Sequence, residues 1–181
     1  MGEPLTILHS ESSMGWGGQE IRVFSEVRWL RRHGHAASLV VPPGSLLGER
    51  AEKAAVPVAW IAMPHALDPL AVARIAGRLR RERAQVLVTH SSVDAWTAGL
   101  AARLVGVPVV RMRHLSVPVR TNPISRAVYT ALCDRIVTTG EAIRTLLVDR
   151  LRIPPTKVVS IPTGVDLEAF HPSRGAPVRL R

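Results

Sequence analysis

Cysteine is almost missing from this sequence, which has Cys133 as the only one in 181 residues. A single cysteine can form neither a disulfide within the chain nor a cysteine-rich zinc site, and this fits a reducing compartment. Lysine is nearly as rare, with only Lys53 and Lys157, so arginine supplies almost all of the positive charge. These shortages argue against a small secreted domain held together by disulfides.

Long uninterrupted apolar runs are also missing. The longest apolar stretch, Val93–Val110, carries Asp94 and Arg103, and it is too short and too charged to span a bilayer. Glu3 and His9 interrupt any apolar core that a signal peptide would need. We therefore expect a soluble, cytoplasmic protein, with peripheral contact to an anionic membrane left open.

Positive charge, by contrast, is abundant. The formal net charge is +10 at pH 7, and such a charge attracts phosphates, nucleic acid or anionic membranes. An arginine-rich solvated surface without an anionic partner is the alternative interpretation. Arg74, Arg78 and Arg81 fall on one predicted helix, where they form either a solvated stripe or a face that docks on a membrane.

Short apolar runs alternate with segments of helical period along the chain. The expected strands are Leu5–Leu8, Ser38–Val41, Val56–Ile61, Val86–Thr89, Val107–Met112, Arg135–Thr138 and Val158–Ile161. The expected helices cover 21–33, 68–83 and 95–105, and two more begin at Asn122-Pro123 and at Gly140. Uniformly apolar strands that alternate with helices predict an α/β fold, a Rossmann-like parallel sheet with helices on both faces.

The inward faces of the first two helices follow from the same pattern. The residues expected to face the core are Ile21, Phe24, Val27 and Leu30 on the first helix, and Leu70, Ile75 and Leu79 on the second. Asp68 and Asn122 are expected to cap helix N-termini, because their side-chain oxygens can accept from free amides there. Gly34 and Gly106 are expected to end helices.

The stretch "HSESSMGWGGQE", residues 9–20, joins the first strand to the first helix. Glycines there let the backbone approach a ligand, and the following helix offers free amides and a positive dipole end, which together outline a phosphate site. The stretch does not match the G-x-G-x-x-G motif of dinucleotide-binding folds, because Glu20 occupies the position of the third glycine. The segment "VVPPG" also offers no acidic residue after the second strand, where that motif needs one to bind a ribose. A flexible turn without a ligand remains the alternative.

Five segments resemble the amino-terminal domain of family-4 retaining glycosyltransferases, which have the GT-B fold. The segments are "GWGGQE" with "VRWLRRHGHAASLVVP", "QVLVTHS", "GVPVVRMRH", "DRIVTTGEAIR" and "VSIPTGVDLEAFHP". They occur in the order that the family has and span nearly the whole chain.

The resemblance implies two Rossmann-like domains that face a cleft. Residues 1–172 would form the acceptor-binding domain, residues 173–181 would begin the interdomain linker, and the donor-binding domain would lie outside this chain, which alone would be inactive. A nucleotide-sugar would be the co-substrate, with no other cofactor and no metal, and the acceptor would be a glycan or a lipid-linked molecule. The family's reaction retains the anomeric configuration and is usually described as front-face attack with the donor phosphate as base.

Carried over by the resemblance, Gly17 and Gly18 would approach the donor diphosphate, and His114 would act at the sugar's anomeric carbon as the catalytic residue. His90 and Ser91 would line the same cleft. The residues themselves agree in part, because His9, His90 and His114 each fall at the carboxyl end of a predicted strand, where parallel sheets bind ligands. A strand-end histidine that is only hydrogen-bonded structure is the alternative.

Arg111 and Arg113 alternate along one strand, so both point to the same face. Two guanidinium groups at the cleft would suit an anionic acceptor, because arginine binds phosphate or carboxylate bidentately. Salt bridges to neighbouring helices are an equally good interpretation. Trp16, in the glycine loop, is the one tryptophan expected to contact substrate.

A second function class is a stand-alone anion- or nucleic-acid-binding module, which the charge favours. Against it, the sequence has no basic stripe interleaved with aromatics and no nucleic-acid motif, so we expect no specific nucleic-acid partner. The mismatch with the dinucleotide-binding motif disfavours an epimerase or dehydrogenase of Rossmann type.

Overall fold

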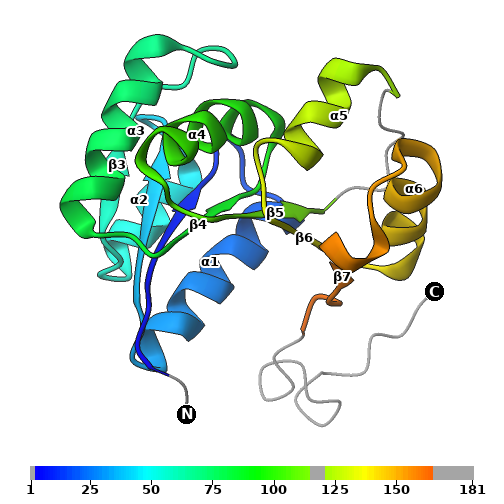
Figure 1. Ribbon diagram of the computed structural model, residues 1–181. Helices are drawn as coiled ribbons and strands as arrows, with labels where there is room; N and C mark the ends of the chain where they lie inside the picture. The colour runs from blue at the N-terminus through cyan, green and yellow to red at the C-terminus, as the bar shows by residue number, and fades with distance from the viewer. Residues whose placement is uncertain (1–2, 115–120, 165–181) are drawn as a thin grey trace, which may run out of the picture.

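The strands form one parallel sheet in the computed structural model, which describes residues 3–114 and 121–164 (Figure 1). The sheet contains seven strands in the order β3-β2-β1-β4-β5-β6-β7, and every neighbouring pair is parallel. The strands are β1 (Thr6–Ser10), β2 (Ala36–Val41), β3 (Val58–Trp60), β4 (Val86–Thr89), β5 (Val109–Arg113), β6 (Arg135–Thr138) and β7 (Val158–Ser160). The predicted α/β fold is confirmed.

Helices cover both faces of the sheet, as Figure 1 shows for α1 on one side and α3 and α4 on the other. The helices are α1 (Gly18–Arg32), α2 (Leu46–Lys53), α3 (Pro69–Glu82), α4 (Ser92–Val105), α5 (Pro123–Thr130) and α6 (Glu141–Leu151). Buried side chains of α3 and α4, such as Ile75 and Ala98, pack with Leu87 of β4. On the opposite face, Val27 of α1 packs with Leu39 of β2.

The predicted helix ends are confirmed by their hydrogen bonds. The Asp68 carboxylate accepts from the Ala71 amide at 2.8 Å, and the Asn122 side chain accepts from the Ser125 amide at 2.7 Å. Gly106, with a φ of +73°, ends α4 in the left-handed conformation that glycine adopts without strain.

Two predicted inward residues are wrong, because Ile21 is 46% and Leu70 is 57% exposed. The three-residue repeat that begins at Ile21 advances 300° per step on a helix of 3.6 residues per turn, so it drifts away from any fixed face. Leu70 precedes Ile75 by five residues, or about 500°, which places it about 140° away from the face of Ile75. The buried side of α1 instead follows a mixed spacing through Glu20, Val23 and Val27.

Helix α2 is an element that the sequence pattern did not predict. It begins directly after the Pro42-Pro43-Gly44 turn, where the Ser45 hydroxyl accepts from the Gly48 amide at 3.3 Å. Gly48 lies directly under the Trp60 ring, and a Cβ at this position would come within 2.3 Å of it. The absence of a side chain is therefore what lets α2 pack against β3.

No helix among residues 3–114 and 121–164 is both long enough and apolar enough to cross a lipid bilayer. The expectation of a cytoplasmic protein remains a prediction.

The contact of Gly48 with Trp60 leads to a stability prediction. Gly48→Ala should lower the free energy of unfolding by about 1–3 kcal/mol, because the added methyl group displaces a packed indole. Gly77→Ala is the matched control, since a Cβ on this exposed α3 glycine meets no atom within 4 Å. The control should gain about 0.5–1 kcal/mol from helix propensity. Urea denaturation of both variants tests this, and equal stabilities would contradict the packing.

Candidate functional site

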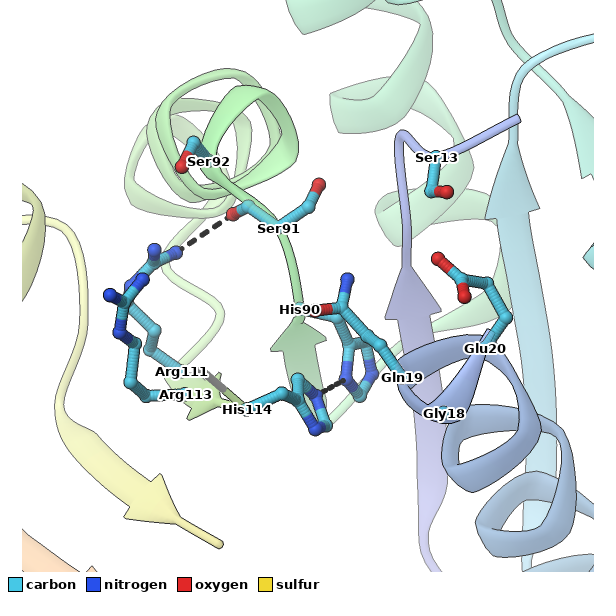
Figure 2. Close-up of a pocket in the computed structure, with 10 residues that line it drawn as sticks. All are labelled: Ser13, Gly18, Gln19, Glu20, His90, Ser91, Ser92, Arg111, Arg113 and His114. Atoms are coloured by element: carbon cyan, nitrogen blue, oxygen red, sulfur yellow. Dashed lines mark hydrogen bonds between the residues drawn. The ribbon is translucent and has the colours of Figure 1, made fainter. Parts of the chain in front are cut away.

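A cavity of about 370 Å³ lies at the carboxyl edge of the sheet, beside the ends of β4 and β5 and the N-termini of α1 and α4 (Figure 2). The residues that line it are Ser13, Gly18, Gln19, Glu20, His90, Ser91, Ser92, Arg111, Arg113 and His114. Helix N-termini, imidazoles and guanidinium groups therefore share one polar space.

The N-terminus of α1 forms one wall of the cavity. The Glu20 carboxylate accepts from the Gly17 amide at 2.7 Å and closes the first turn of the helix. Burial raises the pKa of Glu20, but hydrogen bonds from Ser13 and from Gly17 outweigh burial and hold the pKa below its ordinary value. Gly18 is exposed, and a Cβ there would meet no atom within 4 Å. A ligand can therefore approach the backbone at Gly18.

Three histidines form a chain that runs from the sheet into the cavity. Nδ1 of His9 lies 3.0 Å from Nε2 of His90, and Nδ1 of His90 lies 3.1 Å from Nε2 of His114. His9 is fully buried, His90 is nearly so, and His114 is half-buried in the cavity wall. Burial lowers the pKa of His9 to about 3 and that of His114 to about 4, and it holds the pKa of His90 well below 6.5. All three rings are therefore neutral at pH 7.

Buried carboxyl groups hold the start of α4 in place. Asp94 accepts from the amides of His90 and Ser91, each at 2.8 Å, and from the Ser91 hydroxyl at 2.6 Å. Glu11 accepts from the Ser13 amide at 2.9 Å and from the Gln19 side chain. Burial and the nearby Glu11 raise the pKa of Asp94 to about 7, and burial raises the pKa of Glu11 as well.

The two arginines of β5 both line the cavity, as their alternation predicted. Arg111 is 3% exposed, donates to the Ser91 carbonyl at 3.0 Å, and lies over the Tyr129 ring at 4.9 Å. Its Nε is buried without a hydrogen-bond partner in the described structure. Figure 2 shows the guanidinium groups of Arg111 and Arg113 on the side of the cavity away from α1. Among the described residues, no ion pair that the structure records involves Arg111.

Six of the eight predicted site residues line this cavity, namely Gly18, His90, Ser91, Arg111, Arg113 and His114. Gly17 lies one residue outside the lining and is held by its bond to Glu20. Trp16 is not part of the lining. It packs edge-on against Phe24, and the Arg50 guanidinium lies 4.3 Å from its ring centre. That it contacts substrate stays a prediction.

Several polar lining residues were not predicted from the sequence, namely Ser13, Gln19, Glu20 and Ser92. Glu20 carried a signal, because an acidic residue three positions after an N-cap is the capping-box pattern. Asp94, three positions after the N-cap residue Ser91, shows the same capping-box pattern. In residues 3–114 and 121–164, no group of three or more histidine, cysteine, aspartate or glutamate side chains could hold a metal ion. The expected absence of a metal remains a prediction.

The chain is similar to known glycosyltransferases in both sequence and structure. It is 32% identical over 104 residues to the UDP-Gal:alpha-D-GlcNAc-diphosphoundecaprenol alpha-1,3-galactosyltransferase of Escherichia coli, a match that covers 52% of this chain and 27% of the relative. It is 32% identical over 124 residues to the D-inositol 3-phosphate glycosyltransferase of Stackebrandtia nassauensis, covering 58% of this chain and 28% of the relative.

Among solved structures, a glycosyltransferase from Rickettsia africae superposes with a TM-score of 0.82 at 19% identity, covering 97% of this chain and 47% of that one. This likeness establishes the shared fold. The chain therefore spans about half of the solved structure, and its matches span about a quarter of the two relatives. Residues 16–169 match the sequence profile of Glycosyltransferase Family 4, and the chain belongs to this family.

Proposed function

We propose that this chain is the acceptor-binding half of an enzyme that transfers a sugar from a nucleotide-sugar to an acceptor. The observation that supports this best is the cavity at the carboxyl edge, which combines an open helix N-terminus, a neutral imidazole and two guanidinium groups. The helix N-terminus can hold a diphosphate, the imidazole can contact a sugar, and the guanidinium groups can hold an anionic acceptor.

The donor diphosphate would bind at the start of α1. Free amides and the positive end of the helix dipole attract phosphate there, and the open space at Gly18 leaves room for its oxygens. The name of the E. coli relative specifies UDP-galactose as its donor. A UDP-sugar is accordingly the donor class to test first.

The acceptor would be anionic and would bind beside Arg111 and Arg113. Arg111 is already oriented by the Ser91 carbonyl and the Tyr129 ring. Binding there would cost little conformational entropy, because the side chain is ordered beforehand. The acceptors in the names of both relatives carry phosphate, as an undecaprenyl diphosphate and as an inositol phosphate.

Retention of configuration would proceed by front-face attack, with the donor phosphate as base. Glu20 is the one carboxylate among the described residues that line the cavity. Its Oε2 already accepts from the Gly17 amide, and this hydrogen bond favours a structural role over that of a covalent nucleophile. That arrangement supports a mechanism without a glycosyl-enzyme intermediate.

Most donor contacts would come from a second domain, so we expect the 181-residue chain alone to be inactive. Contact with an anionic membrane would involve α3, on which Arg74 and Arg81 are exposed while Arg78 pairs with Glu82.

The test of the proposed function is a transfer assay with UDP-sugars and phosphorylated acceptors on the longer protein that contains this chain. Failure of every UDP-sugar and every other nucleotide-sugar to react would overturn the proposal.

His114→Ala in that longer protein should lower kcat by two to three decades, or about 2.7–4 kcal/mol, if its hydrogen bond forms chiefly in the transition state. The acceptor KM should change little. Steady-state kinetics with both substrates varied measures the two effects. An unchanged kcat with a raised KM would instead assign His114 to ground-state binding.

Arg113→Gln should raise the KM of a phosphorylated acceptor, because it removes a positive charge from the cavity wall. The difference from wild type should shrink as salt screens the attraction. Arg113→Lys should restore only part of the affinity, since the planar fork is lost. An uncharged acceptor analogue is the control, and an equal loss on both acceptors would show that Arg113 has a structural role.

A further inference from the structure

The hydrogen bonds along the histidine chain can all be donated in one direction, and the proposed function does not use this property. His9, His90 and His114 come from three different segments, β1 and the ends of β4 and β5, yet their rings are joined in series. Neighbouring ring centres lie 5.3 Å and 5.4 Å apart, and Figure 2 shows the His90–His114 link at the base of the cavity. His9 forms the buried end of the chain, and His114 forms the end at the cavity.

The number of protons limits how this chain can be arranged. Each neutral imidazole has one N–H and one acceptor nitrogen, and each hydrogen bond in the chain consumes one N–H. Three neutral rings with two bonds between them leave one N–H at one end and one bare lone pair at the other. In one arrangement Nδ1–H of His114 points outward, and in the other Nε2–H of His9 does.

The buried end discriminates between the two arrangements. Among residues 3–114 and 121–164, Nε2 of His9 finds no hydrogen-bond partner, and it has no contact with solvent. Buried N–H groups without a partner are rarer in proteins than buried acceptors without one. The lone pair therefore belongs at His9, and the remaining N–H belongs at His114.

We propose that His9 and His90 are positioning residues that fix His114 as the Nδ1–H tautomer, so that it presents a hydrogen-bond donor to the ligand in the cavity. His9 donates from Nδ1 to Nε2 of His90, and His90 donates from Nδ1 to Nε2 of His114. Within the described structure, Nδ1 of His114 makes no hydrogen bond, so its proton is available. His114 then acts as a donor and not as a base.

The chemical class of the partner follows from this tautomer. A neutral N–H donor suits an oxygen acceptor, either a sugar hydroxyl or a phosphate oxygen. The choice of ligand rests on the proposed function, whereas the tautomer does not. The low pKa values of the three rings support the proton count, since they keep the chain neutral at pH 7.

The tautomers can be read directly from the nitrogen chemical shifts of the ¹⁵N-histidine-labelled 181-residue chain at pH 7.5. We expect all three histidines of the chain to show a protonated Nδ1 and a bare Nε2. A protonated Nε2 on His114 in the wild-type chain would overturn the proposal. This measurement needs no turnover, so its outcome is independent of the transfer assay.

The role of His90 is tested in the same spectrum. His90→Phe should release His114, because the bond on one ring nitrogen sets which nitrogen carries the proton. An Nε2–H signal should then appear on His114. His65→Phe, at a histidine whose side chain is 67% exposed, is the control and should leave His114 unchanged. Persistence of pure Nδ1–H in folded His90→Phe would remove His90 from the positioning role.

Two amide substitutions carry the test to catalysis in the longer protein. The amide of asparagine lies near the position of Nδ1, whereas that of glutamine lies near Nε2. His114→Asn should therefore recover at least about tenfold in kcat over His114→Ala, while His114→Gln should not. Recovery by glutamine and not by asparagine would overturn the assignment of the donor to Nδ1.

Discussion

The parallel direction of the sheet is the constraint on which the site depends. Every strand pair is parallel, so the carboxyl ends of β1, β4 and β5 must lie at one edge. Because β1, β4 and β5 also lie side by side in the sheet, His9, His90 and His114 become hydrogen-bonded neighbours although they are far apart in sequence. The same geometry places the N-termini of α1 and α4 at that edge, because each helix follows a strand that ends there.

The carboxyl groups buried at this edge are stabilised by the hydrogen bonds that they accept. Asp94 holds two backbone amides and the Ser91 hydroxyl, and Glu11 holds the loop before α1. These hydrogen bonds offset part of the free-energy cost of removing carboxyl groups from water. The pKa of Asp94 is still raised, because burial outweighs its hydrogen bonds. The network orients Ser91, whose carbonyl then orients Arg111. The arginine that faces the cavity is thus positioned by a carboxyl group that does not line it.

The sequence predicted those parts of the fold that depend on local pattern. The strands predicted at 86–89 and 135–138 have the same bounds as β4 and β6, since each is a short apolar run between polar turns. His90 and His114 could be placed at strand ends because the apolar runs stop just before them. His9 also lies near the carboxyl end of β1, as predicted, but its burial was not predicted, because β1 continues through Ser10 and buries both polar residues.

What the sequence did not predict depends on packing between distant segments. Helix α2 has only eight residues, and its position depends on the fit of Gly48 under Trp60, 12 positions further along the chain. The contacts of the Trp16 ring with Phe24 and Arg50 were not predicted either, and the expected contact of Trp16 with substrate stays a prediction. The direction of the histidine chain depends on a nitrogen without a partner, which no sequence pattern shows.

The proposed function requires that the cavity hold the donor diphosphate at the start of α1, with the transferring sugar beside His114. The most direct test is a structure of the longer protein bound to a non-transferable UDP-sugar analogue. We predict a diphosphate oxygen within hydrogen-bonding distance of the Gly18 amide and the anomeric carbon next to His114. A donor bound with its diphosphate away from α1, and with His114 facing only solvent, would contradict this assignment.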